Sequence, residues 1–308
     1  MALSYYFESC TDWKPLFLEC LIMICAACGT IHKTLPLKAV HEQPYKGDVL
    51  RYQIYGCADC GTQFCDPMKA APPDWYAHIG EYYGWRWEFE HFLEDVVPLV
   101  NTHDPFRILE IGCGEGIVLE RLRAIADEVW GLEFNRAAAQ AGSAKGLRVI
   151  EASIEEFSSR YSGETFSAVA FFQVLEHVED PLAFLRIVRR LLPQTGRIYL
   201  SVPNPDRCQL NIYRESWDYP PHHLSRFTKE GLQRLLSRAG FDILKLIPRP
   251  MDRESRRSLR KSLYKRLPLP KFLKAIVKFP LRVVLYPAGW YYWVSSEGQD
   301  LYVMAQPK

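Results

Sequence analysis

The sequence has no run of about 18 uncharged apolar residues, the length that a membrane-spanning helix needs, so no such helix is expected. It also lacks a large excess of either charge, with 38 Lys and Arg against 36 Asp and Glu, and its net charge therefore identifies no partner. The first 23 residues have no basic segment before their apolar positions, and Lys14, Pro15 and Glu19 interrupt them, which argues against a signal peptide. The remaining composition, 48% hydrophobic and 24% charged, is that of a globular protein.

Cysteine, by contrast, is not scarce, and four of the nine cysteines form two Cys-x-x-Cys pairs, each followed by glycine. The pairs are Cys25 with Cys28 and Cys57 with Cys60. Two intervening residues let both thiolates of a pair face one ion, and four thiolates complete a closed tetrahedral zinc site. Because such a site leaves no position open for substrate, we expect a structural role. The alternative is two unrelated pairs or a redox pair, but the paired spacing favours a metal in a reducing cytoplasm.

The two pairs resemble those of a zinc ribbon. A strand is expected between them at residues 49–54, and so small a module needs its metal because it cannot bury a sufficient core alone. Zinc ribbons can bind nucleic acid, but the loops around these cysteines carry few basic residues, so no nucleic-acid partner is expected. Residues 1–22 precede the module without an evident role, and Met23 is a candidate for the true start of translation.

The segment from Ile108 to Gly116 combines a short apolar run with three closely spaced glycines. The run predicts a buried strand, and after the glycines apolar residues recur at helical spacing: Val118, Leu119, Leu122 and Ile125. Strand, glycine turn and helix form a layout in which backbone N–H groups can approach a ligand closely. The carboxylate of Glu110, just before the turn, suits a ligand with a cationic amino group better than a pyrophosphate.

Strands and helices alternate along the rest of the chain, which predicts a doubly wound α/β fold with a parallel sheet. A helix is expected over residues 225–239, and the strands over residues 129–132, 147–150, 166–172, 197–202, 241–247 and 300–305. Glu133 ends the second strand about 20 residues after the glycines, where a carboxylate can accept hydrogen bonds from ribose hydroxyls. Phe134 follows and could lie against an adenine ring.

Three features together resemble the class I S-adenosylmethionine-dependent methyltransferases: the glycine motif at residues 110–116, the acidic strand end at Glu133, and the run Leu-Glu-His-Val-Glu-Asp-Pro at residues 175–181. That run is similar to the LEHxxDP segment of a subgroup that includes quinone, sugar and natural-product methyltransferases. The resemblance covers roughly residues 103–250 and the last strand. It implies a seven-stranded Rossmann-like sheet whose last strand is antiparallel.

The resemblance also implies S-adenosylmethionine as the cofactor. The expected contacts are Glu110, Gly112, Cys113, Gly114, Gly116, Glu133, Phe134, Ser153, Ile154, Gln173 and Tyr83. Many relatives place an Asp near the adenine after the third strand, and Ser153 takes that position here. Gln173 is expected to line the methionine part chiefly through its backbone, whereas the side chain of Cys113 is expected to pack rather than react.

Methyl transfer from a sulfonium requires an oriented acceptor and, where needed, removal of the acceptor's proton. Histidine is the usual base near neutral pH, and three histidines are near the expected cleft. His177 follows the fourth strand, and His222 and His223 lie in a loop after the fifth that two prolines stiffen. The subgroup's pattern favours His223 slightly over His222, while His177 is equally well explained as a brace of its loop. The sequence does not choose among the three.

Two further segments are rich in aromatic or basic residues. Residues 74–97 predict a helix that packs on the sheet, a lid that brings Tyr83 to the methionine end of the cofactor, or both. Residues 249–296 form a strongly basic insertion before the last strand. A solvated basic face is its simplest interpretation, and contact with an anionic membrane or a phosphate-bearing substrate is the alternative.

The sequence therefore predicts a cytoplasmic methyltransferase acting on oxygen or carbon of a small polar acceptor, with a sugar or glycosylated metabolite as the first expectation. One alternative is O-methylation of a quinone or lipid at the inner face of the membrane, and another is a non-catalytic protein that binds the cofactor. The segment Pro203-Asn204-Pro205 does not match the motif used for amino-group methylation. The expected organisation is an extension (1–22), a zinc ribbon (23–68), an aromatic linker or lid (69–102) and a methyltransferase domain (103–308). The oligomeric state is not indicated.

Overall fold

The structure is a computed structural model that describes residues 22–33, 40–46, 48–70, 84–102, 105–206, 218–250 and 297–308. Three expectations concern segments outside these residues: the N-terminal extension before residue 22, the segment that contains Tyr83, and the basic insertion between residues 251 and 296. Within the described residues, no helix has both the length and the apolar character needed to span a membrane.

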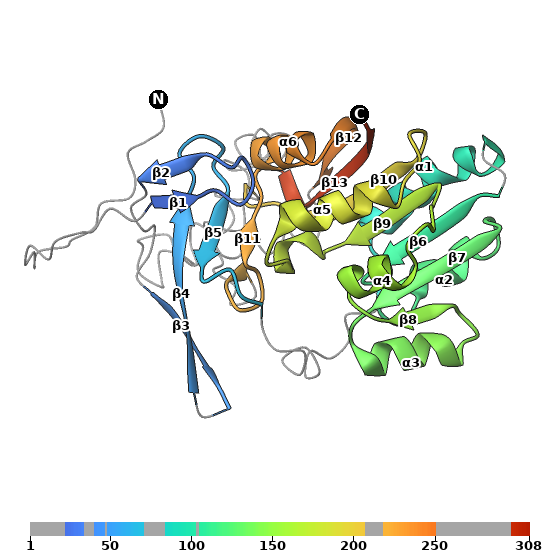
Figure 1. Cartoon of the computed structure of the whole chain (residues 1–308), viewed down its shortest axis with the longest axis horizontal. Coiled ribbons are helices and arrows are strands. Elements are labelled where there is room, and N and C mark those ends of the chain that lie inside the picture. Colours follow the sequence, from blue (N-terminus) through green and yellow to red (C-terminus); the bar gives the residue numbers. More distant parts are fainter. Residues whose placement is uncertain are drawn as a thin grey trace, which may run out of the picture.

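Seven of the described strands form one sheet in the order β12-β13-β10-β9-β6-β7-β8 (Figure 1). Their bounds are β6 (Arg107–Ile111), β7 (Glu128–Glu133), β8 (Val149–Glu151), β9 (Ala168–Phe172), β10 (Arg197–Pro203), β12 (Phe241–Pro250) and β13 (Glu297–Pro307). β6 pairs in parallel with β7 and β9, whereas β13 pairs antiparallel with β10 and β12. The expected α/β fold and the antiparallel last strand are confirmed.

The chain runs from β6 outward to β8 and then returns to β9 on the other side of β6. Ligands of open α/β sheets bind at the carboxyl ends of the strands at such a switch point. The apolar run Ala-Val-Ala-Phe-Phe of β9 is buried at every position, as expected for a parallel strand that is covered on both faces.

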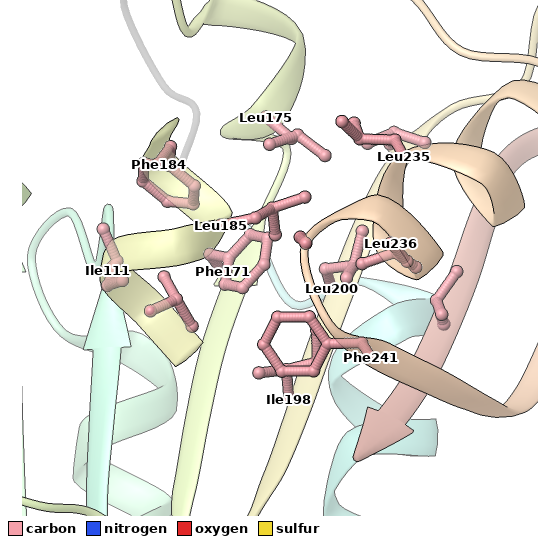
Figure 2. Close-up of a cluster of buried hydrophobic side chains, with 14 of the residues drawn as sticks. Ile111, Phe171, Leu175, Phe184, Leu185, Ile198, Leu200, Leu235, Leu236 and Phe241 are labelled. Atoms are coloured by element: carbon pink, nitrogen blue, oxygen red, sulfur yellow. The ribbon is translucent and has the colours of Figure 1, made fainter. Parts of the chain in front are cut away.

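Helices cover both faces of this sheet. On one face, α1 (Trp87–Val96) and α2 (Ile117–Leu122) share a buried cluster with Phe172 and Tyr199. On the other face, α5 (Pro181–Arg190) and α6 (Lys229–Arg238) pack over residues such as Phe171 (Figure 2). The buried residues of α4 (Ile154–Arg160) belong to the same cluster. Truncating a fully buried residue such as Phe171 to Ala would cost about 3–5 kcal/mol. The helix expected in the aromatic segment is therefore present as α1 and packs on the sheet.

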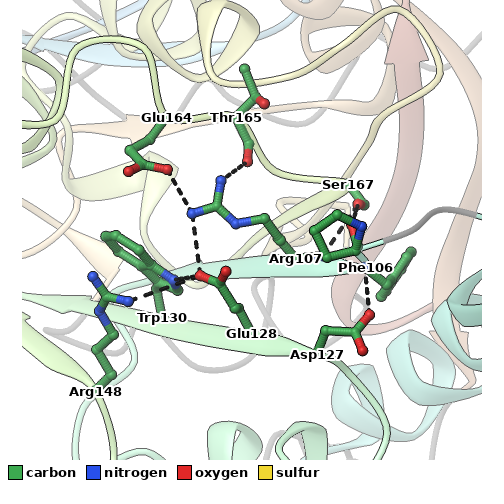
Figure 3. A network of polar contacts seen from close by, with 10 residues as sticks. Phe106, Arg107, Asp127, Glu128, Trp130, Arg148, Glu164, Thr165 and Ser167 are labelled. Atoms are coloured by element: carbon green, nitrogen blue, oxygen red, sulfur yellow. Dashed lines mark hydrogen bonds and ion pairs between the residues drawn. The ribbon is translucent and has the colours of Figure 1, made fainter.

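A polar network closes the amino ends of β6 and β7 (Figure 3). Arg107 donates to the carbonyl of Thr165 at 2.8 Å and to the carboxylate of Glu164 at 2.6 Å. It also lies 3.2 Å from the Glu128 carboxylate, which accepts the indole N–H of Trp130 at 2.9 Å. Partly exposed pairs of this kind contribute about 1 kcal/mol or less each. The network lies at the edge opposite the switch point, where it supports the sheet without contacting the ligand side.

The N-terminal strands form two smaller sheets. β1 (Ile22–Ile24) and β2 (Ile31–Lys33) flank the first cysteine loop (residues 25–30) as a hairpin. β3 (His41–Tyr45), β4 (Asp48–Gly56) and β5 (Gln63–Asp66) join β11 (Ser225–Arg226) in the order β11-β5-β4-β3. We call β1 to β5 with the two cysteine loops (25–30 and 57–62) the four-cysteine module. The strand expected at residues 49–54 is confirmed as part of β4.

Several expected boundaries differ from the structure by two to four residues, and two of the differences have a clear physical reason. The helix expected from residue 225 begins at Lys229, because Ser225 and Arg226 pair with β5 and the Thr228 side chain caps the helix by accepting the N–H of Gly231. The strand expected at residues 147–150 is β8, which begins only at Val149. Leu147 instead packs against Cys113 and Leu119 under the glycine loop, a tertiary contact that periodicity along the chain does not reveal.

Candidate active site

The glycine loop joins the carboxyl end of β6 to α2. Gly112 and Gly116 have φ angles of 72° and 82°, in the left-handed region, where only glycine is free of strain. A Cβ at Gly112 would lie 2.6 Å from Cγ2 of Val174, which follows β9. The N–H of Gly112 donates to the carbonyl of Leu132 in β7 at 2.7 Å. The loop is thus held between the two strands that flank β6, with its backbone at the switch point.

Two carboxylates lie at the carboxyl ends of neighbouring strands. Glu110 is 3% exposed, and burial together with the nearby Glu133 raises its pKa well above the usual range. Glu133 accepts the N–H groups of Gly114 at 2.9 Å and Asn135 at 2.8 Å, and burial raises its pKa as well. Glu133 therefore fixes the glycine loop. Burial disfavours ionisation of Glu110, and a cationic ligand group beside it would favour the ionised form. Both residues suit the amino and ribose groups of the expected cofactor.

The expected adenine contacts follow β7 and β8. Phe134 is 50% exposed, so an adenine ring can reach its face. Ser153 is the N-cap of α4, where its Oγ accepts the N–H of Glu156 at 3.2 Å and the Glu156 carboxylate accepts the N–H of Ser153 at 2.8 Å. Ile154 is the buried first residue of the same helix. Ser153 thus has a structural role in addition to the adenine contact that remains predicted for it.

The other expected contacts divide into packing and backbone roles. The side chain of Cys113 is buried against Leu119 and Leu147, in agreement with the packing role expected for it. Gln173 has a φ of 55°, and its amide donates to Ser201 Oγ at 3.1 Å and to a carboxylate oxygen of β13 at 3.4 Å. This turns its side chain toward β10 and β13. Its backbone N–H donates to the carbonyl of Ser201 at 3.0 Å, so the predicted backbone contact would fall to its carbonyl. Tyr83 lies outside the described residues.

The three candidate bases come together at the carboxyl edge of the sheet. His177 ends the short 3₁₀ helix η3 (Leu175–His177) after β9, and His222 and His223 lie just before β11. Their ring centroids are 4.6 to 4.9 Å apart, and the Nδ1–H of His177 donates to the carbonyl of His222. The sequence placed each loop at this edge, but it gave no signal that the rings touch.

Two acids and burial set the electrostatics of the histidines. Glu176 Oε1 lies 3.9 Å from His177 Nε2 and 4.0 Å from His223 Nε2, and Asp218 Oδ1 lies 3.8 Å from His223 Nδ1. Burial, with the neighbouring His222, lowers the pKa of His177 to about 3, and burial lowers that of His222 to about 4. Both rings are therefore neutral at pH 7, the form that accepts a proton. Burial raises the pKa of Glu176 to about 8.

Two residue clusters in the described part of the chain have the spacing of metal ligands. The nitrogens of His177, His222 and His223 lie within 4.8 Å of one another, so the three rings could also surround one ion.

Asp218, beside His223, is a residue to which the sequence gave no role. Its only signal was its position in the Trp-Asp-Tyr-Pro-Pro-His-His loop.

The sulfurs of the four paired cysteines form the other cluster. Cys25 Sγ is 3.7 Å from Cys60 Sγ, and Cys28 Sγ is 3.5 Å from Cys57 Sγ. Around zinc, with bonds of about 2.3 Å, neighbouring sulfurs are about 3.8 Å apart. The glycine after each pair has a left-handed φ, 74° and 70°, and donates its N–H back to the first cysteine's carbonyl at 2.9 Å. The size and closed turns of the cluster fit a four-thiolate zinc site.

A small pocket lies between the four-cysteine module and the histidine loop (residues 218–226). Its walls include Ile54 and Phe64 from the module and Tyr219 and His223 from the loop. The guanidinium of Arg226 lies 5.4 Å from the centre of the Tyr219 ring. The module therefore contributes both apolar side chains, such as Ile54 and Phe64, and the polar Gln63 next to one of the candidate bases.

Comparisons with known proteins agree with this geometry. The model of a family described as "Methyltransferase domain" matches residues 85–246. A "Ubiquinone biosynthesis O-methyltransferase" from Cereibacter sphaeroides (strain ATCC 17029 / ATH 2.4.9) is 30% identical over 179 residues, which cover 54% of this chain and 68% of that protein. A protein of the same name from Aromatoleum aromaticum is 32% identical over 104 residues, or 32% of this chain and 44% of that protein.

The fold comparison points the same way. The crystal structure of a SAM-dependent methyltransferase from Archaeoglobus fulgidus has a TM-score of 0.52 to this chain at 18% identity. The match covers 75% of this chain and 99% of that one. At this identity the likeness concerns the fold alone.

Proposed function

Because the chain belongs to the family of proteins with this methyltransferase domain and is an S-adenosylmethionine-dependent methyltransferase, we propose that it methylates a hydroxyl oxygen of a small quinone-type acceptor. The relatives named for ubiquinone biosynthesis support this alternative better than the sugar acceptor that was the first expectation.

The observation that carries the proposal is the meeting of three histidines at the carboxyl edge of the sheet. His177 is four residues beyond Gln173, the predicted contact of the cofactor's methionine part, and His222 and His223 pack against it. An acceptor hydroxyl held at this edge would therefore have both a methyl donor and a proton acceptor nearby. Orientation of this kind supplies much of the rate in group transfer.

S-adenosylmethionine supplies a methyl group that is already activated on its sulfonium. The chain has to hold the acceptor oxygen in line with the methyl–sulfur bond and to take the hydroxyl proton onto an imidazole nitrogen as the oxygen–carbon bond forms. We favour His223 for this step, because it lines the pocket and its Nδ1 lies 3.8 Å from the carboxylate of Asp218, which would stabilise the resulting imidazolium.

We further propose that the four paired cysteines hold one structural zinc ion. The sulfur spacing of 3.5 and 3.7 Å supports this assignment, and a site closed by four thiolates has no position for an acceptor. The zinc would stabilise the module that forms one wall of the pocket, and the methyl transfer itself would take place at the histidine edge.

The test is an assay for S-adenosylhomocysteine formation with a soluble hydroxyquinol or catechol that carries a short alkyl chain, run beside a nucleotide sugar. We expect turnover with the ring acceptor and none with the sugar. Replacing His223 with Asn should lower kcat by about 100-fold or more, while calorimetry shows S-adenosylmethionine affinity within twofold of the parent.

Three outcomes separate the alternatives. Turnover with the nucleotide sugar alone would restore the first expectation. Cofactor binding without turnover on any acceptor would favour the non-catalytic protein. An unchanged kcat in His223→Asn, with a large loss in His177→Asn or His222→Asn, would move the base to another of the three rings.

A further inference from the structure

Helix α6 is fastened at each end to a different cysteine loop. At its start, Thr228 accepts the N–H of Gly231 at 3.0 Å and donates its own hydroxyl to the carbonyl of Cys60. At its end, Arg238 donates to the carbonyl of Ala27 at 2.6 Å. The Arg238 guanidinium lies so close over Gly29 that a Cβ there would be 2.5 Å from its central carbon. The helix therefore spans the two loops whose four sulfurs converge.

Strand β11, between the histidines and this helix, is also fixed to the module. Ser225 pairs with Phe64 of β5, and Arg226 pairs with Gln63 (Figure 1). Leu224, which directly follows His223, accepts the N–H of Cys65 at 3.0 Å and donates its own N–H to the carbonyl of Glu176 at 2.8 Å. Leu224 thus joins the module on one side to the loop of His177 on the other. A shift of β5 would move the histidine loop with it.

The packing between the module and helix α6 is continuous. Three of the four paired cysteines belong to the same buried cluster as the apolar face of the helix, which includes Leu232, Leu235 and Leu236. Gly231 lies directly on Thr62 of the second cysteine loop, with no room for a Cβ between them. Displacing the cysteine loops would therefore open part of the core under α6, beyond the loss of surface hydrogen bonds.

From these contacts we propose that the four-cysteine site, when it holds its metal, is the positioning element of the catalytic histidine loop, and that Thr228, Arg238 and the β5–β11 pair transmit its position. The proposal rests on the proposed function only in treating His222 and His223 as catalytic. Small modules of this kind lose their fold without the metal. Loss of the metal should then release the histidine loop while the cofactor side of the sheet stays folded.

The direct test is hydrogen exchange of the full chain before and after a chelator removes the metal, with metal content checked by mass spectrometry. Peptides covering residues 218–226 should exchange at least tenfold faster in the metal-free protein, and those covering residues 107–116 should change less than twofold. S-adenosylmethionine affinity should also stay within twofold. Unchanged exchange of residues 218–226 in protein shown to be metal-free would overturn the proposal.

A matched pair of variants addresses the case in which metal removal unfolds the whole chain. Arg238→Met removes the bond to the first cysteine loop. Arg234→Met, one turn earlier, removes an exposed pair with Glu230 at 2.5 Å and a longer-range attraction to the thiols of Cys28 and Cys60, but no described hydrogen bond to a cysteine loop. With metal content unchanged in both, Arg238→Met should raise exchange of residues 218–226 and lower kcat at least fivefold, with S-adenosylmethionine affinity unchanged. Equal effects of the two variants would contradict the transmission.

A second pair concerns the other end of the helix. Thr228→Val loses the hydroxyl that donates to Cys60, and Thr228→Ser keeps it. The serine variant should restore the exchange pattern and kcat of the parent, while the valine variant should resemble Arg238→Met. Failure of serine to rescue would mean that the hydroxyl is not the transmitting contact. The exchange readout needs no turnover, so it stands even if no acceptor is found and the proposed function fails.

Discussion

The two sides of the site are built over very different distances along the chain. On the cofactor side, Glu110, the glycine loop and Glu133 belong to successive strand-turn-helix units. On the histidine side, the loops after β9 and before β11 meet, and the second is held by contacts as remote as the one between Cys60 and Thr228, which are 168 residues apart. Local backbone conformation fixes the first side, whereas long-range pairing fixes the second. The two sides should therefore fail under different changes.

The largest difference between the two sides is expected when Cys57, a proposed metal ligand, is replaced. Cys57→Ser should lose the metal and lower the free energy of unfolding by on the order of 5 kcal/mol, since structural zinc contributes about 10 kcal/mol or more in isolated zinc-finger peptides. Residual folded protein should still bind S-adenosylmethionine, because the cofactor side shares no hydrogen bond with the cysteine loops among those described. Calorimetry and metal analysis measure the two effects.

The matched control for this change is Cys65→Ser, which alters a buried cysteine of β5 outside the paired set. It should keep the metal and cost far less stability. If Cys57→Ser kept its metal, or lost no more stability than Cys65→Ser, the four-thiolate assignment would be wrong.

Replacing Gly112 should have the opposite result, a loss of cofactor affinity without a loss of metal. Gly112→Ala combines a φ of 72° with a Cβ only 2.6 Å from Val174, and strain of this kind costs about 1–3 kcal/mol. Affinity for S-adenosylmethionine should fall at least tenfold while the metal content stays that of the parent. Gly146→Ala has a similar φ, 75°, with no atom within 4 Å of the added Cβ, and it should lose stability without losing affinity. Equal affinity losses in both would mean that backbone strain alone is responsible.

The same contrast explains what could be predicted from the sequence. The strand at residues 108–111, the glycine turn and the acidic end at Glu133 follow one another directly, so spacing alone placed them. Ser225 and Arg226 read as the start of a helix because their partner, β5, is remote in sequence. A role for Asp218 could not be predicted for the same reason, because its contact with His223 forms only when the loop folds. Pairing across the chain carries no local signal.

Replacing Glu110 should have two smaller effects of opposite sign, one on stability and one on cofactor affinity. Its carboxyl group is buried, and holding it protonated at a pH where the unfolded chain has released the proton costs stability. Glu110→Gln should therefore stabilise the ligand-free protein by about 1 kcal/mol. It should also weaken S-adenosylmethionine by about 10- to 100-fold, because a charge-assisted hydrogen bond to the amino group, typically about 1.5–3 kcal/mol, is lost. Glu120→Gln on the partly exposed side of α2 should do neither.

The pH dependence of stability provides a sharper form of this prediction. The pKa of Glu110 is raised in the folded state, so the folded chain holds this proton at pH values where the unfolded chain has released it. The contribution of Glu110 is therefore full below its ordinary value near 4.5 and is lost as pH rises through the higher folded pKa. The melting temperature of the ligand-free parent should fall, relative to that of Glu110→Gln, as pH rises through this range. If the melting temperatures of the two proteins change in parallel with pH, the assignment is contradicted.

The smallest effect separates capping from ligand contact. Ser153 and Asp180 are the N-caps of α4 and α5, and each accepts a backbone N–H from its helix. Replacing either with Ala should cost about 1 kcal/mol of stability. Because Ser153 lies at the predicted adenine position and Asp180 lies beyond the histidine edge, only Ser153→Ala should also weaken S-adenosylmethionine, by about threefold for a contact shared with a cap. If calorimetry shows the same affinity for both variants, Ser153 is a cap alone, and the adenine side rests on Phe134 and the backbone of α4.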